Sequence, residues 1–502
     1  MLKGKNSLYK LVKSLEKEEK RYFRIYVGRT KKGQDARFIQ LFDLLDQASE
    51  YNEAQLRKKM GLSDKPGQYA NLKRHLYQEL LTSLRLQLVP KHVDLQIREQ
   101  LDFARILYSK GHYMESLKLL ERIKEVAKSN NQDILHLEVL EFQKHIEARH
   151  ITRSRQIAKK MDRLLEESTM RSMVTHRASV MANLNIQIHG YYIEHGFAIS
   201  EADHQDLQVA WQHMQPTYLL TRFQDTFFEK VNRIQALLWY RYIQADLRGA
   251  QGHAAEWVNL FRIHPKMRAY DPDLYMRSLY YLMVFYFLTD DIAGFEQSFA
   301  ELDHFIEHES PTFNRNSELV AFVYRELSVL NRCFLQQDYP KGLHESRRIK
   351  SLLKAYGDRV DSHRVMLFEY KFAAIRFALG RYQAARAYLG KLLHYRKQIL
   401  RHDIDINARL LELMCLYETR EFDFMGSRLT SLARSMGKDK TATPLQKYTL
   451  TLLRELHRQQ FQSPKEVLTP HATAYHREGI HPADQFFLKY LNVAAWIHKH
   501  LE

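Results

Sequence analysis

The chain has 502 residues, of which 18 are glycine and 11 are proline. Both shares are about half of the usual values of roughly 7% and 5%. Sheets joined by tight turns need more of both residues, so the composition favours long helices with short links. The longest apolar run, Leu279–Leu288, has ten residues, which is too short for the roughly 20 that span a bilayer.

Charge is distributed unevenly along the chain. The formal net charge is +17, and residues 1–90 carry 19 Lys and Arg against 10 Asp and Glu, a net +9. The other 412 residues carry 57 against 49, a net +8. Because half of the excess lies in less than a fifth of the chain, residues 1–90 are the part that an anionic partner would contact.

Five helices are predicted within residues 1–90 from apolar spacing and from the residues that end helices. Their predicted bounds are 7–15, 16–26, 36–48, 53–60 and 68–88. Gly61 closes the fourth helix, Ser63–Gly67 forms a turn, and Pro90 ends the fifth. These helices do not follow the repeat found later in the chain, so we expect a separate basic domain over residues 1–90.

The fourth and fifth helices and the link between them have the outline of a helix-turn-helix, although the link is longer than the usual three or four residues. Basic residues flank this link, and they are the candidate nucleic-acid contacts: Arg57, Lys58, Lys59, Lys73 and Arg74. The alternative is a helical cap over the first repeat, since repeat arrays need capped ends. In that case the basic side chains are simply solvated.

A helical hairpin is predicted at Leu107–Ile123, LYSKGHYMESLKLLERI. Gly111 can adopt the left-handed conformation that closes a helix. Tyr113 follows the turn, and the small Ser116 allows two helices to approach closely. Leu120 and Ile123 share its face, at steps of four and three. This stretch resembles the tetratricopeptide repeat, whose second half reads G-x-Y-x-x-small followed by apolar residues.

A second good copy lies at residues 377–392, FALGRYQAARAYLGKL, with Ala385 as its small residue. Weaker copies complete a series, marked by the residue in the position of Tyr113: Tyr113, Ile151, Phe197, Leu247, Ile292, Tyr339, Tyr382, Phe422 and Phe461. The steps between marks range from 38 to 50 residues, longer than the family's usual 34 or so. Long-helix repeats are therefore expected, and an irregular all-α domain is the alternative.

The whole chain also resembles a large uncharacterised bacterial family. The resemblance is carried by KSLEKEEKRYFRIY (residues 13–26), NLKRHLYQELLTSLR (residues 71–85) and the hairpin at residues 107–123. Members of that family have a basic N-terminal helical region followed by tetratricopeptide-like repeats. The resemblance covers the full length and implies a fold, but no activity.

No sequence pattern indicates catalysis or a bound cofactor. Glycine loops for nucleotides, G-x-S-x-G and HExxH are lacking, and the two cysteines, Cys333 and Cys415, are not spaced to form a metal site. His471, His476 and His481 recur every five residues, which is not a known zinc pattern. We therefore expect no enzyme activity, cofactor or metal. Both cysteines are expected to be buried and reduced, which suits the cytoplasm.

The predicted fold is all-α: a right-handed α-solenoid of tetratricopeptide-like hairpins over residues 95–502, behind the N-terminal cap or helix-turn-helix-like region. The predicted function is a scaffold or adaptor that binds a protein or peptide on the concave face. Basic and aromatic residues on first helices are the candidate groove contacts: Arg105, Tyr240, Arg241, Arg325 and Arg376. The alternative is a ligand-sensing regulator whose region 1–90 contacts DNA or RNA, an expectation by analogy of architecture.

Overall fold

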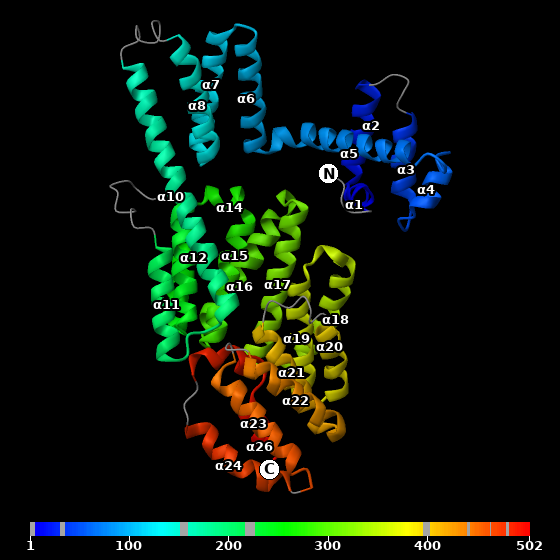
Figure 1. The fold of residues 1–502 in the computed structure, drawn as a ribbon, viewed down its shortest axis with the longest axis vertical. Helices are drawn as coiled ribbons and strands as arrows, with labels where there is room; N and C mark the ends of the chain where they lie inside the picture. The colour runs from blue at the N-terminus through cyan, green and yellow to red at the C-terminus, as the bar shows by residue number, and fades with distance from the viewer. Residues whose placement is uncertain are drawn as a thin grey trace. The chain divides into compact units, whose positions relative to one another are not determined.

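The computed structural model describes residues 6–30, 36–150, 159–215, 226–394, 402–438, 442–461, 463–477 and 481–502. Over these residues the secondary structure is helical and includes no strand, as the low glycine and proline content predicted. The chain divides into two compact units, residues 1–175 and 176–502, which can be followed by colour in Figure 1. A search of the described helices found none that is long and apolar enough to cross a membrane.

The first unit begins with helices that enclose their own apolar core. They are α1 (Ser7–Ser14), α2 (Lys17–Thr30), α3 (Ala36–Gln47), α4 (Glu53–Lys59) and α5 (Pro66–Leu88). Phe23, Phe42 and Leu76 are fully buried among them. Helix α5 starts two residues earlier than predicted, because Pro66 suits the first position of a helix.

The hairpin predicted at residues 107–123 is confirmed in the same unit. It consists of α6 (Val93–Ser109) and α7 (Tyr113–Ser129), followed by α8 (Asp133–Arg149) and the first part of α10 (Lys160–His195); the short 3₁₀ helix η1 (Val89–Lys91) precedes it. Ser116 is fully buried, and its hydroxyl donates to the carbonyl of Ala104 at 2.7 Å. Figure 1 shows α6, α7 and α8 side by side. A small side chain at position 116 is therefore what lets α6 and α7 touch.

Several charged and polar side chains are buried between α7, α8 and α10. Lys124 is 9% exposed and lies between Glu121 (2.6 Å) and Glu167 (3.3 Å). His136 is fully buried, with its Nε2 3.1 Å from Glu167. Burial and the nearby Arg171 hold the pKa of His136 below its ordinary value. Because a buried charge is costly unless paired, these groups depend on one another.

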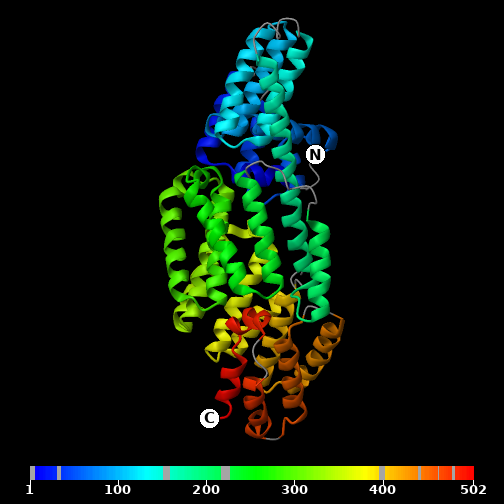
Figure 2. The ribbon, with the colours of Figure 1, turned by 90° about the vertical axis from the view of Figure 1, so that its left-hand side faces the viewer.

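The second unit continues from the rest of α10 as a series of helices, each packed against neighbours in the sequence. The helices are α11 (Glu201–Met214), α12 (Phe227–Ile243), α13 (Leu247–Ile263), α14 (Lys266–Tyr270), α15 (Pro272–Leu288), α16 (Ile292–Glu309), α17 (Arg315–Leu335), α18 (Tyr339–Tyr356), α19 (Ser362–Ala378), α20 (Tyr382–His394), α21 (His402–Glu418), α22 (Phe422–Lys438), α23 (Pro444–Arg458) and α24 (Pro464–Arg477). Figures 1 and 2 both show α12 to α17 side by side. Their interior is rich in aromatic side chains, including Trp257, Tyr275 and Phe295, all at most 1% exposed.

Six of the nine predicted repeat marks are the first residue of a helix: Tyr113, Leu247, Ile292, Tyr339, Tyr382 and Phe422. Two residues before each mark the backbone is left-handed, with φ between +55° and +86°: Gly111, Ala245, Asp290, Gln337, Gly380 and Arg420. In every one of these turns, the amide just before the helix donates to the carbonyl five residues earlier, at 2.8–3.0 Å. This is the Schellman motif. One turn geometry therefore recurs, although glycine occupies only two of the six positions.

Two weaker marks are wrong, and one is not tested. Phe197 lies in a link, because α10 continues to His195 and the next helix begins only after Ser200, whose side chain caps it. Phe461 is 94% exposed and precedes α24 by three residues. Ile151 lies outside the described residues. At Phe197 the local cap at Ser200 sets the helix start instead of the predicted mark.

The chain's last helix is not continuous. The segment 481–502 forms the 3₁₀ turn η5 (Pro482–Asp484), α25 (Gln485–Tyr490) and α26 (Val493–Lys499). Between them Leu491 is extended, with φ −140° and ψ 92°, and the side chain of Asn492 caps α26. This break lets α25 pack against α15, α17 and α19. We call residues 481–502 the C-terminal segment.

Candidate functional site

The candidate groove arginines on α6 and α12 are half exposed and carry acidic partners. The Arg105 guanidinium lies 2.9 Å from Glu138 of α8, with the ring of Phe142 beneath it at 5.6 Å. Arg241 lies 3.6 Å from Asp246, the residue that caps α13. Exposed pairs of this kind contribute little stability. These two side chains can therefore exchange their present partners for another carboxylate at small cost.

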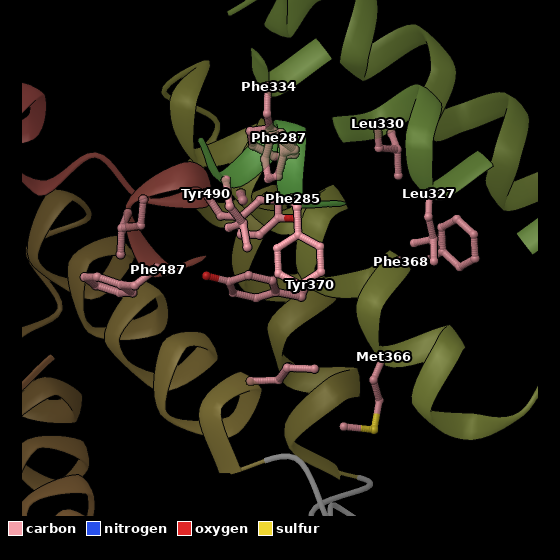
Figure 3. Packing of buried hydrophobic residues seen from close by; sticks show 14 of the residues in the cluster. Phe285, Phe287, Leu327, Leu330, Phe334, Met366, Phe368, Tyr370, Phe487 and Tyr490 are labelled. Carbon is pink, nitrogen blue, oxygen red and sulfur yellow. The ribbon is translucent and has the colours of Figure 1, made fainter. Parts of the chain in front are cut away.

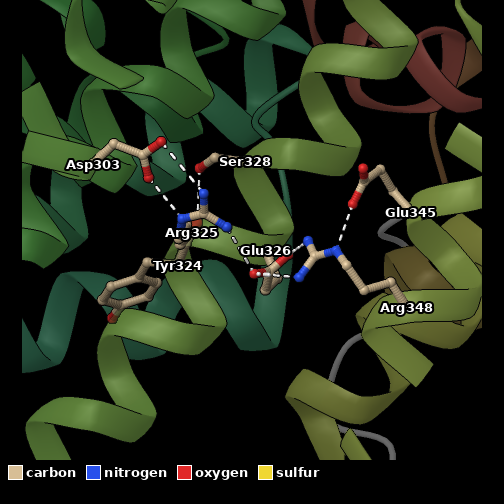
Figure 4. Close-up of polar contacts among 7 residues, drawn as sticks. All are labelled: Asp303, Tyr324, Arg325, Glu326, Ser328, Glu345 and Arg348. Atoms are coloured by element: carbon tan, nitrogen blue, oxygen red, sulfur yellow. Dashed lines mark hydrogen bonds and ion pairs between the residues drawn. The ribbon is translucent and has the colours of Figure 1, made fainter. Parts of the chain in front are cut away.

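Arg325 belongs to a network that joins three helices (Figure 4). Its Nε lies 2.6 Å from Asp303 of α16, and its Nη1 lies 3.0 Å from Glu326. Glu326 has only 4% of its side chain exposed, and it also pairs with Arg348 of α18, which in turn contacts Glu345 at 2.7 Å. The buried Glu326 needs both arginines. Arg325 is thus committed to holding α16, α17 and α18 together.

The remaining two groove candidates pack against neighbouring helices, Tyr240 partly buried and Arg376 buried. Tyr240 stacks on Trp211 with ring centres 4.5 Å apart. Arg376 is 6% exposed, so its prediction as a groove contact is wrong. It donates to the Ser346 hydroxyl at 3.2 Å and lies 4.3 Å from the ring centre of Tyr388, and burial lowers its pKa. Arg376 fills the space between α18, α19 and α20.

Two of the five candidate nucleic-acid contacts have structural roles. Lys73 was expected to be exposed, but only 18% of its side chain is, and its amine lies 2.9 Å from Glu53. Arg57 donates to the carbonyls of Leu62 and Ser63, which closes the turn after α4. Both side chains therefore hold α4 against the start of α5, and neither projects freely into solvent.

The other three candidates face solvent. Lys58 and Lys59 are exposed at the end of α4, and Arg74 is exposed on α5, where it donates to Asn71 at 3.1 Å. Among the ion pairs of the described residues none includes these three side chains. Their positive charges can attract the phosphates of a nucleic-acid backbone, and this attraction does not depend on the base sequence. The basic surface at the link is nevertheless smaller than the sequence indicated.

The C-terminal segment inserts an aromatic side chain into the second unit (Figure 3). The ring of Tyr490 lies 4.9 Å from that of Phe334 and 5.7 Å from that of Tyr370. Its hydroxyl donates to Asn331 at 3.0 Å and accepts from the amine of Lys371, which also donates to Asn331. Burial holds the pKa of Lys371 well below its ordinary value. The Lys371 amine thus completes a buried polar cluster that fastens the segment.

Further contacts fasten the segment to the ends of successive hairpins. Lys489 pairs with Asp290, the left-handed residue of the α15–α16 turn. Trp496 Nε1 donates to Glu418 of α21 at 2.6 Å. Burial alone would raise the pKa of Glu418, but hydrogen bonds with His500 and Trp496 hold it below its ordinary value. The segment therefore crosses the hairpins in the order of the sequence, from α15 to α21.

Beside the segment is a cavity of about 470 Å³. Its walls come from the turns of the α15–α16, α17–α18 and α19–α20 hairpins and from α25 and α26. Lys489 and Lys499 line it, and the Lys499 amine donates to the Tyr382 hydroxyl at 2.6 Å. That hydrogen bond raises the pKa of Lys499, so its amine stays charged.

Sequence reasoning missed this arrangement. The only available signal was the density of aromatic and basic residues in QFFLKYLNVAAWIHKH, residues 485–500. Read as one amphipathic helix, this stretch hides its break at Leu491 and gives no indication of which hairpins it contacts. Both cysteines, Cys333 and Cys415, are buried, as predicted. Over the described residues no group of three or more His, Cys, Asp or Glu side chains could hold a metal ion.

In comparisons with known proteins, no family model, no curated protein and no solved structure matches the chain.

Proposed function

We propose that the chain is a non-enzymatic scaffold or adaptor, built as a tetratricopeptide-like α-solenoid that binds another protein. One observation carries the proposal: the second unit holds a short helical segment, residues 481–502, across successive hairpins. The segment is held by one aromatic side chain that packs among buried rings, and by lysines that form an ion pair and a hydrogen bond with residues at the hairpin turns. A repeated turn geometry offers similar positions at each hairpin, which is how repeat proteins build long binding surfaces.

The proposal is supported by two half-exposed arginines whose present ion pairs can be exchanged for others. Arg105 and Arg241 are about half exposed, with side-chain values of 51% and 48%, and each rests on one carboxylate. Arginine recognises carboxylates with a planar fork of donors and is enriched in interfaces. An acidic segment of a partner protein would compete with Glu138 or Asp246 for these guanidinium groups.

The test is purification of the tagged chain from its native host after chemical cross-linking, with identification of both proteins and nucleic acid. We expect one or a few proteins, with cross-links to the helices that carry Arg105 and Arg241. Arg241→Glu should reduce recovery of that protein, because it places a like charge against an acidic partner. Arg420→Glu, the same charge change at an exposed turn residue, is the matched control. Recovery of nucleic acid and no protein would contradict the proposal.

A second candidate function is a nucleic-acid contact by residues 1–90, favoured by the solvent-facing charges of Lys58, Lys59 and Arg74. With about three neutralised phosphates of duplex DNA, log K should fall with a slope near −2.7 against log salt, at roughly −0.9 per contact. Fluorescence anisotropy with a labelled duplex and a labelled single strand at two salt concentrations measures this slope.

The matched variants change equal numbers of charges. Replacing Lys58, Lys59 and Arg74 by glutamine should abolish the salt-dependent binding. A control replaces exposed lysines of the second unit, Lys354, Lys447 and Lys465, by glutamine. If binding is absent at low salt, or both triple variants bind alike, the N-terminal region is a cap and not a nucleic-acid contact.

A further inference from the structure

Two arginines and three tyrosines form a cluster on α15, α17 and α19, which pack against one another in that order. Tyr280 of α15 stacks on Tyr324 of α17, with ring centres 4.5 Å apart. The guanidinium of Arg277 lies 5.6 Å from the ring centre of Tyr281, and that of Arg364 lies 5.7 Å from the ring centre of Tyr324. Burial raises the pKa of Tyr324, and both arginines oppose this. Two cations, from α15 and α19, therefore converge on one side chain of α17.

Arg277 differs from other partly buried arginines of this unit. Arg325 and Arg332 each pair with a carboxylate of α16. Arg277 is half-buried as well, but the ion pairs among the described residues do not include it, and the groups that act on it are Tyr281 and Tyr324. Burial alone would lower its pKa, but these tyrosines hold it above the ordinary value. A guanidinium partly removed from water without a counter-charge is costly, so an anion that pairs with it gains binding energy.

The cluster lies on the face that already holds a piece of polypeptide. Tyr490 of the C-terminal segment contacts one residue on each of the three helices, namely Phe287, Asn331 and Lys371. Seven residues, which are two turns and about 10 Å of helix, separate each contact from a member of the cluster: Phe287 from Tyr280, Asn331 from Tyr324, and Lys371 from Arg364. The arginines and tyrosines thus continue the surface that binds the C-terminal segment.

The net charge of the cluster favours a ligand with a single negative charge. Arg364 pairs with Asp361 at 3.1 Å, and 29% of its side chain is exposed. Only the charge of Arg277 is then left to balance, so the sum over these three side chains is +1. A carboxylate supplies one negative charge, and its two oxygens match the fork of donors that a guanidinium presents.

We propose that this cluster binds an aspartate or glutamate side chain from a peptide segment of a partner protein. The carboxylate accepts from Arg277, and the rest of the segment runs along α15, α17 and α19 beside residues 481–502. This inference rests on the scaffold function, because a partner must supply the peptide. It adds the place on the second unit where the partner docks and the charge that the partner carries there.

The test uses the full chain and two rhodamine-labelled dodecapeptides. In one, glutamate alternates with alanine, and in the other, glutamine replaces every glutamate. Fluorescence anisotropy measures the affinity of each. We expect the glutamate peptide to bind about tenfold or more tightly than the glutamine peptide, as for hydrogen bonds to a charged group. A labelled thymidine dodecanucleotide tests whether phosphate can take the place of the carboxylate.

Variants locate the binding on the chain. Arg277→Gln should weaken binding of the glutamate peptide about tenfold, and Arg277→Lys, which keeps the charge but loses the fork, should retain part of the affinity. Arg262→Gln is the matched control. It removes the same charge from α13, where Arg262 is half exposed and pairs with Glu301, and it should change nothing. Circular dichroism and thermal unfolding confirm that each variant remains folded.

Binding that Arg277→Gln weakens and Arg262→Gln does not change supports the site. Four results would overturn it: equal binding of the two peptides, equal loss in both glutamine variants, binding of the oligonucleotide through Arg277 without binding of the peptide, or no peptide binding at millimolar concentration. The last result, with Arg277→Gln lowering only the unfolding temperature, means that Arg277 merely packs on the tyrosines. If cross-linking recovers a partner while the peptides fail, only this site is wrong. If the peptides bind through Arg277 but no partner is recovered, the scaffold function is wrong.

Discussion

One helix interface in the first unit and one in the second are held together with different chemistry. In the first unit, α7, α8 and α10 meet through Lys124, Glu167 and His136, all paired across the interface. In the second unit, α15, α17 and α19 meet through aromatic side chains such as Phe287 and Phe334. The turns are alike in both units, since Gly111 and Gln337 occupy the same left-handed position. A shared turn thus fixes the hairpin, while the interface chemistry between hairpins is free to differ.

The difference should appear as different responses to solution conditions. Apolar burial is proportional to area and does not change with pH or moderate salt. Paired charges depend on protonation and are screened by salt where they are exposed. We therefore expect the interface of α7, α8 and α10 to respond to pH near neutrality through His136, and the interface of α15, α17 and α19 to respond mainly to loss of aromatic volume.

The largest effect is expected from the aromatic interior. Trp257 is 1% exposed, and Trp257→Ala should destabilise the second unit by about 3–5 kcal/mol, through lost transfer energy and a cavity. Hydrogen-exchange mass spectrometry of peptides from α13 and α15 measures the loss, and peptides from α7 are the internal control. A loss below about 1 kcal/mol would mean that the aromatic interior does not dominate this unit.

Breaking the polar interface should have the next largest effect. Lys124→Met removes the cation that lies between Glu121 and Glu167 and should cost about 0.5–1.5 kcal/mol, the net contribution of a typical hydrogen bond, because both carboxylates keep some exposure to water. Hydrogen-exchange mass spectrometry of α8 peptides measures this loss of stability. The double variant Lys124→Met/Glu167→Gln should recover part of the loss, because it removes one stranded charge. If the double variant is as unstable as the sum of the singles, the two residues do not interact.

The pH response of the first unit follows from His136. Its pKa in the folded chain is below the ordinary value of 6.5, so the unfolded chain binds a proton more readily. The contribution of His136 to the free energy of unfolding is fully present above pH 6.5. It decreases as the pH drops below 6.5, by up to about 1.4 kcal/mol per pH unit. His136→Gln should remove this slope in α8 peptides. A slope of the opposite sign would show that the folded state favours the protonated ring.

The turns should give the smallest effect, and an equal one in both units. Gly111→Ala should destabilise by about 1 kcal/mol, because alanine is strained at a φ of +86° although nothing lies within 4 Å of the added Cβ. Arg420→Gly, at a φ of +58°, should instead stabilise by roughly 0.5–1 kcal/mol, after the entropic cost of glycine. Denaturant unfolding measures both changes. If Gly111→Ala stabilised the chain, or if Arg420→Gly destabilised it, side-chain contacts would outweigh the backbone at these turns.

The sequence predicted the features that depend on local spacing. Ser116 and Ala385 are both fully buried where two helices meet, as their place in the repeat indicated. The marks at Leu247 and Ile292 are correct although no glycine precedes them. A better local signal was present: Asp246 and Asp291 directly precede these helices and cap them. An aspartate in that position identifies the turn where glycine is lacking.

The partners of polar side chains could not be predicted in this way. Arg376 and Lys371 lie on one first helix and look like surface residues in the sequence, yet both are buried. Lys371 is buried because Tyr490, which is 119 residues further along the chain, supplies its hydrogen bond. Lys73 likewise is held by Glu53, across the turn between α4 and α5.

By itself the sequence determined the helical class, the hairpin turns and the small residues at helix contacts, because each follows from the spacing of side chains over one or two helical turns. The tertiary structure alone decided which charges are buried and where the C-terminal segment lies. The physical reason is that a helix's own pattern specifies which face turns inward but not which distant segment packs against it. The break at Leu491 and the cavity beside it exist only because the hairpins of α15 to α21 bring their ends together.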